Sequence, residues 1–301
     1  MSYTPYTYTS PYDPAREDDG LFGPESVTWR VMSSRIMWVA VLRALYLQAL
    51  HPRVIRGTLQ NATTITEPAD AWARLRRTRK FIETRTFGTT AEAELAGRRV
   101  RTVHQALTGT DPDGTRYRVD DPELLLWVHC GEVASCADIA RRSRLPFSAA
   151  DLDAFVAEQR TSAELIGIDR TAAPASMAEL DAYYERIRPR LYACDEARRA
   201  LRLTVHPPVP DGNRGLKLGL PPVAVLAFST LPGWAWRMYG GPVGPLSGPL
   251  SDMAATAGLR ATRLALSQQW VFRGAMRAIH RAEAAGSHAG RARPRFTVDS
   301  D

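Results

Sequence analysis

A histidine on an apolar helix face is the first residue of this sequence whose chemistry needs an explanation. In the stretch GRRVRTVHQALTG (97–109), helical spacing places His104 on one face with three aliphatic residues, Val100, Val103 and Leu107. A polar group without a partner is costly to bury, so this imidazole needs a hydrogen bond, a metal ion or a role in proton transfer. A core histidine bonded to a backbone carbonyl and a functional histidine both fit the pattern.

Three other predicted helices carry polar side chains in register with leucine, valine or phenylalanine. These polar residues are His51, Arg74, Arg77, Thr78 and His129. Because an unpaired buried charge is strongly destabilising, the set indicates a bound anionic group. Haem suits both residue types, since its iron binds imidazole and its propionates bind arginine. The simpler alternatives are that His51 bonds a carbonyl near a helix end and that His129 only packs.

The helices that must position these residues follow from capping and breaking signals. We expect a first helix to open at Pro24, further helices over 33–50, 67–86 and 90–107, and three more that begin at Asp120, Ser148 and Ser176. A segment rich in proline and glycine after Pro207 is predicted to connect to a last helix over 250–285. The stretch TGTDPDGTRYRV (108–119) predicts a tight turn or a short hairpin.

The same pass along the chain predicts the fold class and the domain organisation. No alternating run is long enough for a sheet, and no internal repeat is visible. The sequence therefore predicts an all-α fold with one large helical domain over residues 21–285. A flexible arm over residues 1–20 and a flexible tail over residues 286–301 are expected to flank it.

Composition favours a soluble enzyme-sized domain over a nucleic-acid binder. The chain has 301 residues, of which 45% are hydrophobic, so it can bury one large core. Its net charge of +7 is spread along the chain rather than gathered in one block. A helical nucleic-acid binder would need Arg74, Arg76, Arg77 and Arg79 as one exposed ridge. The register of RLRRT with Phe81 argues against that ridge, so we expect no nucleic-acid partner.

Cysteine usage and hydropathy indicate the compartment. The three cysteines form no CxxC, and Cys130 and Cys136 lie in a predicted buried helix, which fits a reducing compartment. The N-terminus shows no secretory signal. The apolar stretches 36–50 and 218–236 are interrupted by Arg43 or by prolines, so neither predicts a transmembrane span. We expect a cytoplasmic protein, with peripheral membrane contact through residues 218–239 left open.

Several motifs occur in an order and spacing that resemble one family. They are HPRVIRG at 51–57, RLRRT at 74–78, FG at 87–88, VHQALTG at 103–109 and GTRYRVDDPELLLWVH at 114–129. Over about residues 20–240 they are similar to the MpaB-type oxygenases and to the rubber oxygenases called latex clearing proteins. The resemblance implies a helical fold with globin-like packing around a haem pocket. It also implies haem b as the cofactor and O₂ as a co-substrate.

The resemblance also assigns roles to individual residues. His104 matches the proximal iron ligand of the rubber oxygenases, and Arg74, Arg77 and Thr78 match their distal Arg-x-x-Lys-Thr motif. Arg77 stands where that motif has lysine, and a guanidinium cannot lose its proton to coordinate iron. The sixth iron position is therefore left open, or taken by water or His51. No carboxylate between Val54 and Glu67 matches the base proposed for rubber cleavage.

The leading hypothesis is a haem b-dependent oxygenase that acts with O₂ on an apolar substrate, such as a terpenoid or a lipid. His104 is expected to bind iron, Arg74 to bind a propionate, and His129 to lie beside the cofactor. Arg77 and Thr78 are expected to donate hydrogen bonds on the oxygen side, with His51 as a further catalytic candidate. A non-catalytic haem carrier or gas sensor that uses the same pocket is the alternative. The redox partner is left open.

Overall fold

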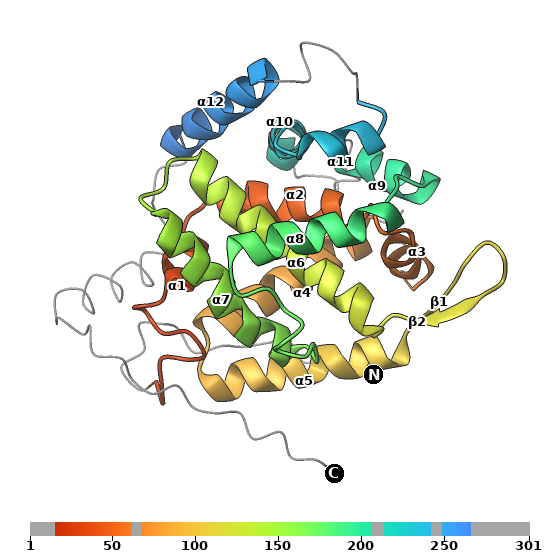
Figure 1. Cartoon of the computed structure of the whole chain (residues 1–301), viewed down its shortest axis with the longest axis horizontal. Helices are drawn as coiled ribbons and strands as arrows, with labels where there is room; N and C mark the ends of the chain where they lie inside the picture. Colours follow the sequence, from red (N-terminus) through yellow and green to blue (C-terminus); the bar gives the residue numbers. More distant parts are fainter. Residues whose placement is uncertain (1–15, 62–67, 206–213, 242–248, 266–301) are drawn as a thin grey trace.

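The computed structural model describes residues 16–61, 68–205, 214–241 and 249–265. These residues are mainly helical, as the sequence predicts, and form one domain (Figure 1). The helices are α1 (Val27–Met32), α2 (Met37–Gln48), α3 (Pro52–Gln60), α4 (Pro68–Phe87), α5 (Thr90–Ala106), α6 (Pro122–Arg142), α7 (Ala149–Leu165), α8 (Met177–Ile187), α9 (Asp195–Val205), α10 (Arg214–Ser229), α11 (Gly233–Met238) and α12 (Pro249–Ala265). A short 3₁₀ helix, η1 (Arg188–Arg190), follows α8.

The core is built around α2 and α6, which pack along each other at the centre of the molecule (Figure 1). Helix α10 covers another side of α2, while α7 lies against α6 and α1. The largest fully buried side chains include Trp29, Leu47, Trp127, Ile139 and Phe155. Because α2 is buried on several sides, its sequence is apolar around most of its circumference.

Local capping explains where the site-bearing helices begin. Thr89 and Glu92 form a reciprocal capping box before α5. Asp121 accepts a hydrogen bond from the backbone of Glu123 at the start of α6, and Pro122 occupies the first turn. The predicted starts of these two helices and of α7 and α8, at Ser148 and Ser176, are therefore confirmed.

The predicted hairpin is also present and is anchored to α3. Strands β1 (Thr108–Thr110) and β2 (Arg116–Arg118) pair antiparallel, with Gly109 opposite Tyr117. A Cβ at Gly109 would lie 2.2 Å from Cζ of Tyr117, so only glycine allows the ring to lie across the strand. The Tyr117 hydroxyl donates to the carbonyl of Arg53 at 2.7 Å. The hairpin thus ties the end of α5 to α3.

His51 lies between two helices. Helix α2 ends at Gln48 and α3 begins at Pro52, so the prediction that His51 lies in register with apolar residues of one helix is wrong. His51 is the N-cap of α3 and has extended backbone angles, φ −87° and ψ 112°. A proline disfavours the helical conformation in the residue before it and is favoured at the first position of a helix, which explains the break.

The region after Pro207 is more helical than predicted. Instead of a plain connection, it contains α10 and α11. Pro221 and Pro222 lie inside α10, where buried Ala224 and Ala227 hold the helix in place. Helix α12 starts where the last helix is predicted, but residues beyond 265 lie outside the described part, as does the predicted tail.

The predicted N-terminal arm falls only partly within the described residues. Residues 1–15 lie outside them. Arg16 donates to the carbonyl of Phe87 at 2.7 Å, and a carboxylate oxygen of Asp18 accepts from the backbone of Thr90 at 2.8 Å. This part of the arm therefore lies against the turn between α4 and α5.

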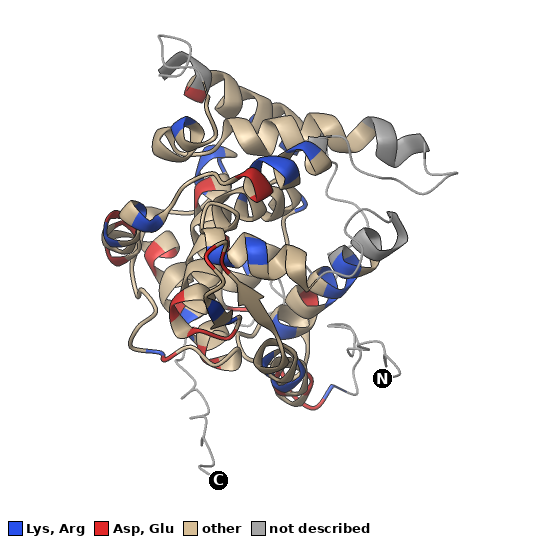
Figure 2. Cartoon of the chain, turned by 90° about the vertical axis from the view of Figure 1, so that its right-hand side faces the viewer, with Lys and Arg blue, Asp and Glu red and all other residues tan. Residues whose placement is uncertain are grey.

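Charges and thiols follow the sequence expectations. Figure 2 shows basic and acidic residues interspersed over the helices. Among the described residues, no helix has both the length and the apolarity to cross a bilayer. Cys130, Cys136 and Cys194 are buried free thiols, and burial raises the pKa of each.

A buried arginine joins α2 to α6 and α10. Arg43 is 5% exposed and lies 3.4 Å from a carboxylate oxygen of Asp138. It also donates to Oγ of Ser135 at 3.0 Å and to the carbonyl of Thr230 at 3.2 Å. Burial alone would raise the pKa of Asp138, but Arg43 and Arg142 hold that pKa below its usual value. The carboxylate is therefore charged when the protein is folded.

We expect Asp138→Ala to lower the free energy of unfolding by about 3–5 kcal/mol, because it leaves the Arg43 charge buried without its partner. Glu185→Ala is the matched control, since Glu185 pairs with Arg188 at the surface and should contribute less than about 1 kcal/mol. Urea denaturation of the two variants measures both effects. Equal losses in the two variants would contradict the role given to the Arg43–Asp138 pair.

Candidate functional site

Helix α4 carries the residues of the predicted polar face. Its most extensive backbone contacts are with α5 and α1. It reaches the central helices through long side chains: Arg85 forms an ion pair with Glu132 of α6, and the Arg79 guanidinium lies 5.4 Å from the ring centre of Trp38 on α2. Phe81 packs against a small apolar cluster that includes Leu125 of α6. Side chains therefore make these contacts between α4 and the two central helices.

His104 lies in the last turn of α5, at one end of that face. The side chain is half-buried, and its Nδ1 is buried without a hydrogen-bond partner. Burial lowers the pKa of His104; Asp120 opposes this shift and Arg74 adds to it. The imidazole is therefore neutral at pH 7, which is the form that binds a metal ion.

Two arginines accompany His104 at this end. Burial and the neighbouring charge of Arg77 lower the pKa of Arg74, although its side chain keeps contact with solvent. The Arg74 side chain is exposed, so a ligand can reach its guanidinium. Among the described residues, Arg74 has no carboxylate partner, and its one hydrogen bond is a long contact of 3.5 Å to the carbonyl of Thr58. An anionic ligand would supply Arg74 with a partner of opposite charge.

An apolar patch separates this end of α4 from the other. It consists of Phe81, Val100 of α5, and Leu125 and Leu126 of α6. The expected apolar face of α5 is only partly correct, because Val103 is 56% exposed and points to solvent, whereas Val100 packs inside. From Arg74 to Arg85 the helix rises by about 16 Å. The face thus combines a polar end, an apolar middle and a second polar end.

His129 lies at the second polar end. It is 4% exposed on α6, and burial, followed by the charge of Arg85, lowers its pKa to about 3. The Arg85–Glu132 ion pair beside it is missing from the sequence prediction. A local signal for both residues exists, since Arg85 follows Phe81 by four positions and Glu132 follows His129 by three, each on the same helix face.

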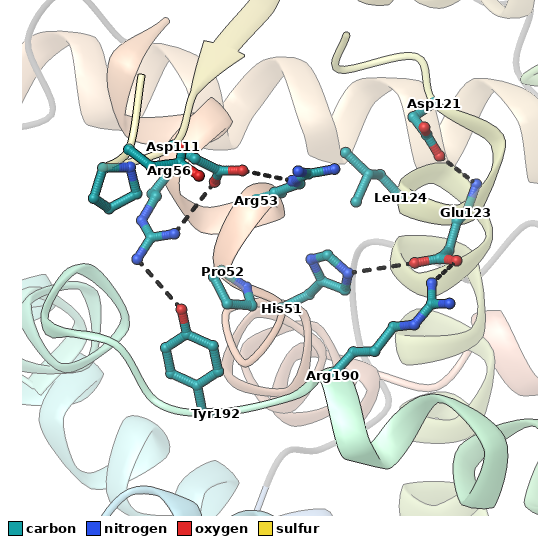
Figure 3. A pocket seen from close by; sticks show the side chains of 12 residues that line it. His51, Pro52, Arg53, Arg56, Asp111, Asp121, Glu123, Leu124, Arg190 and Tyr192 are labelled. Atoms are coloured by element: carbon teal, nitrogen blue, oxygen red, sulfur yellow. Dashed lines mark hydrogen bonds and ion pairs between the residues drawn. The ribbon is translucent and has the colours of Figure 1, made fainter. Parts of the chain in front are cut away.

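His51 belongs to a different cavity, of about 540 Å³, which Figure 3 shows from close by. Its Nε2 lies 3.8 Å from a carboxylate oxygen of Glu123, which also pairs with Arg190. On the opposite side of the cavity, Arg53 and Arg56 both contact Asp111 (Figure 3). Burial lowers the pKa of His51, and Glu123 opposes that shift.

The structure therefore brings only some of the predicted site residues together. Arg74, Arg77 and His104 gather at one end of the α4 face, and His129 lies at the other. Thr78 borders a small apolar pocket on the side of α2, and His51 lies in its own cavity. The catalytic roles given to these residues stay predictions.

The arginines of the RLRRT segment do not form one ridge. Arg74, Arg76, Arg77 and Arg79 are all exposed, so the prediction that Arg74 and Arg77 are buried charges is wrong. At 100° per residue their positions spread around the helix. Arg79 lies over Trp38 on α2, while Arg74 reaches toward Thr58 of α3. The basic stripe that nucleic-acid binding requires is absent from this part of the described chain.

The stability of the fold depends on pH through three histidines whose pKa is lowered by burial, His51, His104 and His129. Each has a pKa below its unfolded value of about 6.5, so the unfolded chain binds more protons as the pH falls. Their stabilisation is present above that pH and is lost below it. His129→Leu should reduce the loss in unfolding free energy between pH 7.5 and pH 5.5 by about 1.4 kcal/mol. Denaturation at the two pH values measures this loss. Leu126→Met, on the same helix, should keep the full loss, and an unchanged loss in His129→Leu would contradict the assignment.

Most of the chain matches one known protein family. The family described as the catalytic domain of ER-bound oxygenase mpaB/B′ and rubber oxygenase matches residues 29–281. Searches of curated proteins and of solved structures give no match. The matched range covers most of the chain and includes α4, α5 and α6 with all the predicted site residues. The chain therefore belongs to the mpaB/B′ and rubber oxygenase catalytic-domain family.

Proposed function

We propose that the protein is a haem b-dependent oxygenase that uses O₂ on an apolar substrate, such as a terpenoid or a lipid. The observation that carries the cofactor proposal is the end of the α4 face. There a neutral imidazole with an unpartnered nitrogen lies beside Arg74, which has no carboxylate partner among the described residues. This donor set fits haem, because a porphyrin supplies four nitrogens of its own and needs one imidazole and cations for its propionates.

Each of these side chains then has a distinct task. His104 would hold the iron, and Arg74 would hold a propionate. Bound haem supplies an iron centre that binds and activates O₂. The patch of Phe81, Leu125 and Leu126 would exclude water from the cofactor face. Excluding water strengthens every hydrogen bond made inside the site.

Arg77 and Thr78 would serve the oxygen side. Arg77 stays charged at any working pH, so it can donate hydrogen bonds and stabilise negative charge but cannot take up a proton. Thr78 borders the apolar pocket between α4 and α2, where its hydroxyl would meet both O₂ and an apolar substrate. His129 is neutral, so it can donate one hydrogen bond without adding a charge to the site.

We expect the purified protein to carry non-covalent haem b, since the chain contains no CxxCH for covalent attachment. His104→Ala should abolish or strongly reduce the haem absorption spectrum, because it removes the nitrogen ligand. Alanine is well tolerated in the helix, so circular dichroism should still show a folded chain. His129→Ala and His51→Ala are the matched controls and should keep the spectrum. A normal spectrum in His104→Ala, with bleaching in either control, would show that another histidine is the ligand.

We expect Arg77→Ala to keep its haem content and to lower turnover by about 10²-fold or more, because one fixed donor is lost from the oxygen side. Oxygen consumption with an isoprenoid or an unsaturated lipid, normalised to haem content, measures the effect. A parallel loss of haem would instead make Arg77 a propionate partner. Reversible O₂ binding without consumption by the unmodified protein would favour the carrier or sensor function.

A further inference from the structure

We propose that a narrow apolar groove between α2 and α4 binds the end of an aliphatic chain and that Trp38 and Arg79 form its mouth. The statement that this chain belongs to the substrate rests on the proposed function. The binding of an aliphatic chain end rests on the groove alone. The walls are Met32 and Met37 near α1 and α2, with Val41, Ile82 and Phe87 completing them.

Solvent exposure distinguishes the mouth of the groove from its floor. Met37 and Phe87 are buried, whereas Trp38 is 39% exposed beside the pocket. An indole that faces water over an apolar recess gains free energy when a ligand covers it, because burial of apolar surface stabilises by about 25 cal/mol per Å². The exposed Trp38 therefore favours an apolar occupant over a polar one.

The volume of the pocket sets the shape of the occupant. Its cavity is about 60 Å³, roughly the space that two molecules occupy in liquid water. For comparison, an engineered apolar cavity of about 150 Å³ binds benzene. The groove is thus too small for a ring system or for haem, but it can take the last few carbons of an unbranched or isoprenoid chain.

The rim of the groove keeps a polar head group outside. Arg79 lies over the Trp38 ring, and its Nε donates to a carboxylate oxygen of Glu83 at 2.6 Å. Both contacts hold the guanidinium at the edge of the pocket rather than inside it. When an aliphatic chain enters the groove, its polar head group would stay outside among solvated charges. Exposed charges interact only weakly, so this placement costs the head group little free energy.

One residue of the groove also has a role in the proposed function. Thr78 forms part of its wall, one turn before Ile82. A chain end seated against Ile82 therefore lies beside the hydroxyl assigned to the oxygen side. We infer that Ile82, Val41 and Trp38 select the substrate by the thickness of its chain.

A fluorescent chain probe tests the groove directly. Dansyl-labelled undecanoic acid should bind the purified full-length protein, whereas dansylglycine, which lacks the chain, should not. Ile82→Phe should weaken binding of the long probe by about tenfold, because it excludes about two methylene groups from the pocket. Val41→Phe fills the same groove from α2 and should act likewise. Trp38→Ala should weaken binding because it removes the indole ring at the mouth of the groove.

Val225→Phe is the matched control, because Val225 is exposed on α10 outside the groove. It should leave probe binding unchanged, and the haem absorption of all variants should stay at the level of the unmodified protein. Equal binding by the unmodified, Ile82→Phe and Val41→Phe proteins would overturn the inference, as would equal binding of dansylglycine. Groove-dependent binding by a protein that takes up no haem would refute the proposed function alone. A haem spectrum without groove-dependent binding would refute the groove alone.

Discussion

The placement of α4 against α5 and α1 is the constraint around which the candidate site is organised. Helices α5 and α1 hold α4 from one side, and Gly97 lets α5 approach α7, since a Cβ there would lie 2.6 Å from Leu165. The Arg85–Glu132 ion pair and the Phe81 ring span the remaining distance to α6. Held in this way, α4 leaves Arg74, Arg77 and Thr78 of its first half exposed, whereas Thr84, Arg85 and Thr86 near its end are buried.

Charge is distributed unequally along the α4 face that carries the candidate site. At the His104 end, Arg74 has no carboxylate partner among the described residues, whereas at the His129 end Arg85 pairs with Glu132. The cavity around His51 is different again, because Arg53, Arg56 and Arg190 all have acidic partners there. The His104 end is therefore the part of this face where an anion adds most stability. That difference separates a candidate cofactor site from a structural ion-pair network.

Signals local in sequence account for most of what could be predicted. The caps at Asp121 and Ser148 correctly predict the starts of two helices. Pro52 disfavours a helical conformation in the residue before it, so it also predicts the break at His51. Other features depend on tertiary packing. Pro221 and Pro222 are helix-breaking residues and predict a loop. The chain is nevertheless helical there, and burial of Ala224 and Ala227 stabilises α10. Periodicity identifies the residues that share a face, but not the distance to the next helix, so the exposure of Val103, the Arg85–Glu132 pair and the α2–α4 groove required the structure.

The buried cysteines have a practical consequence. Alkylating reagents react with the thiolate, and the high pKa and burial of Cys130 and Cys136 keep both thiols protonated and shielded in the folded protein. Cys194 is also buried with a raised pKa. A cysteine introduced at an exposed position would therefore be the most reactive thiol among the described residues. Spin labels or dyes can then be attached at one chosen position while the native sequence keeps its own three cysteines.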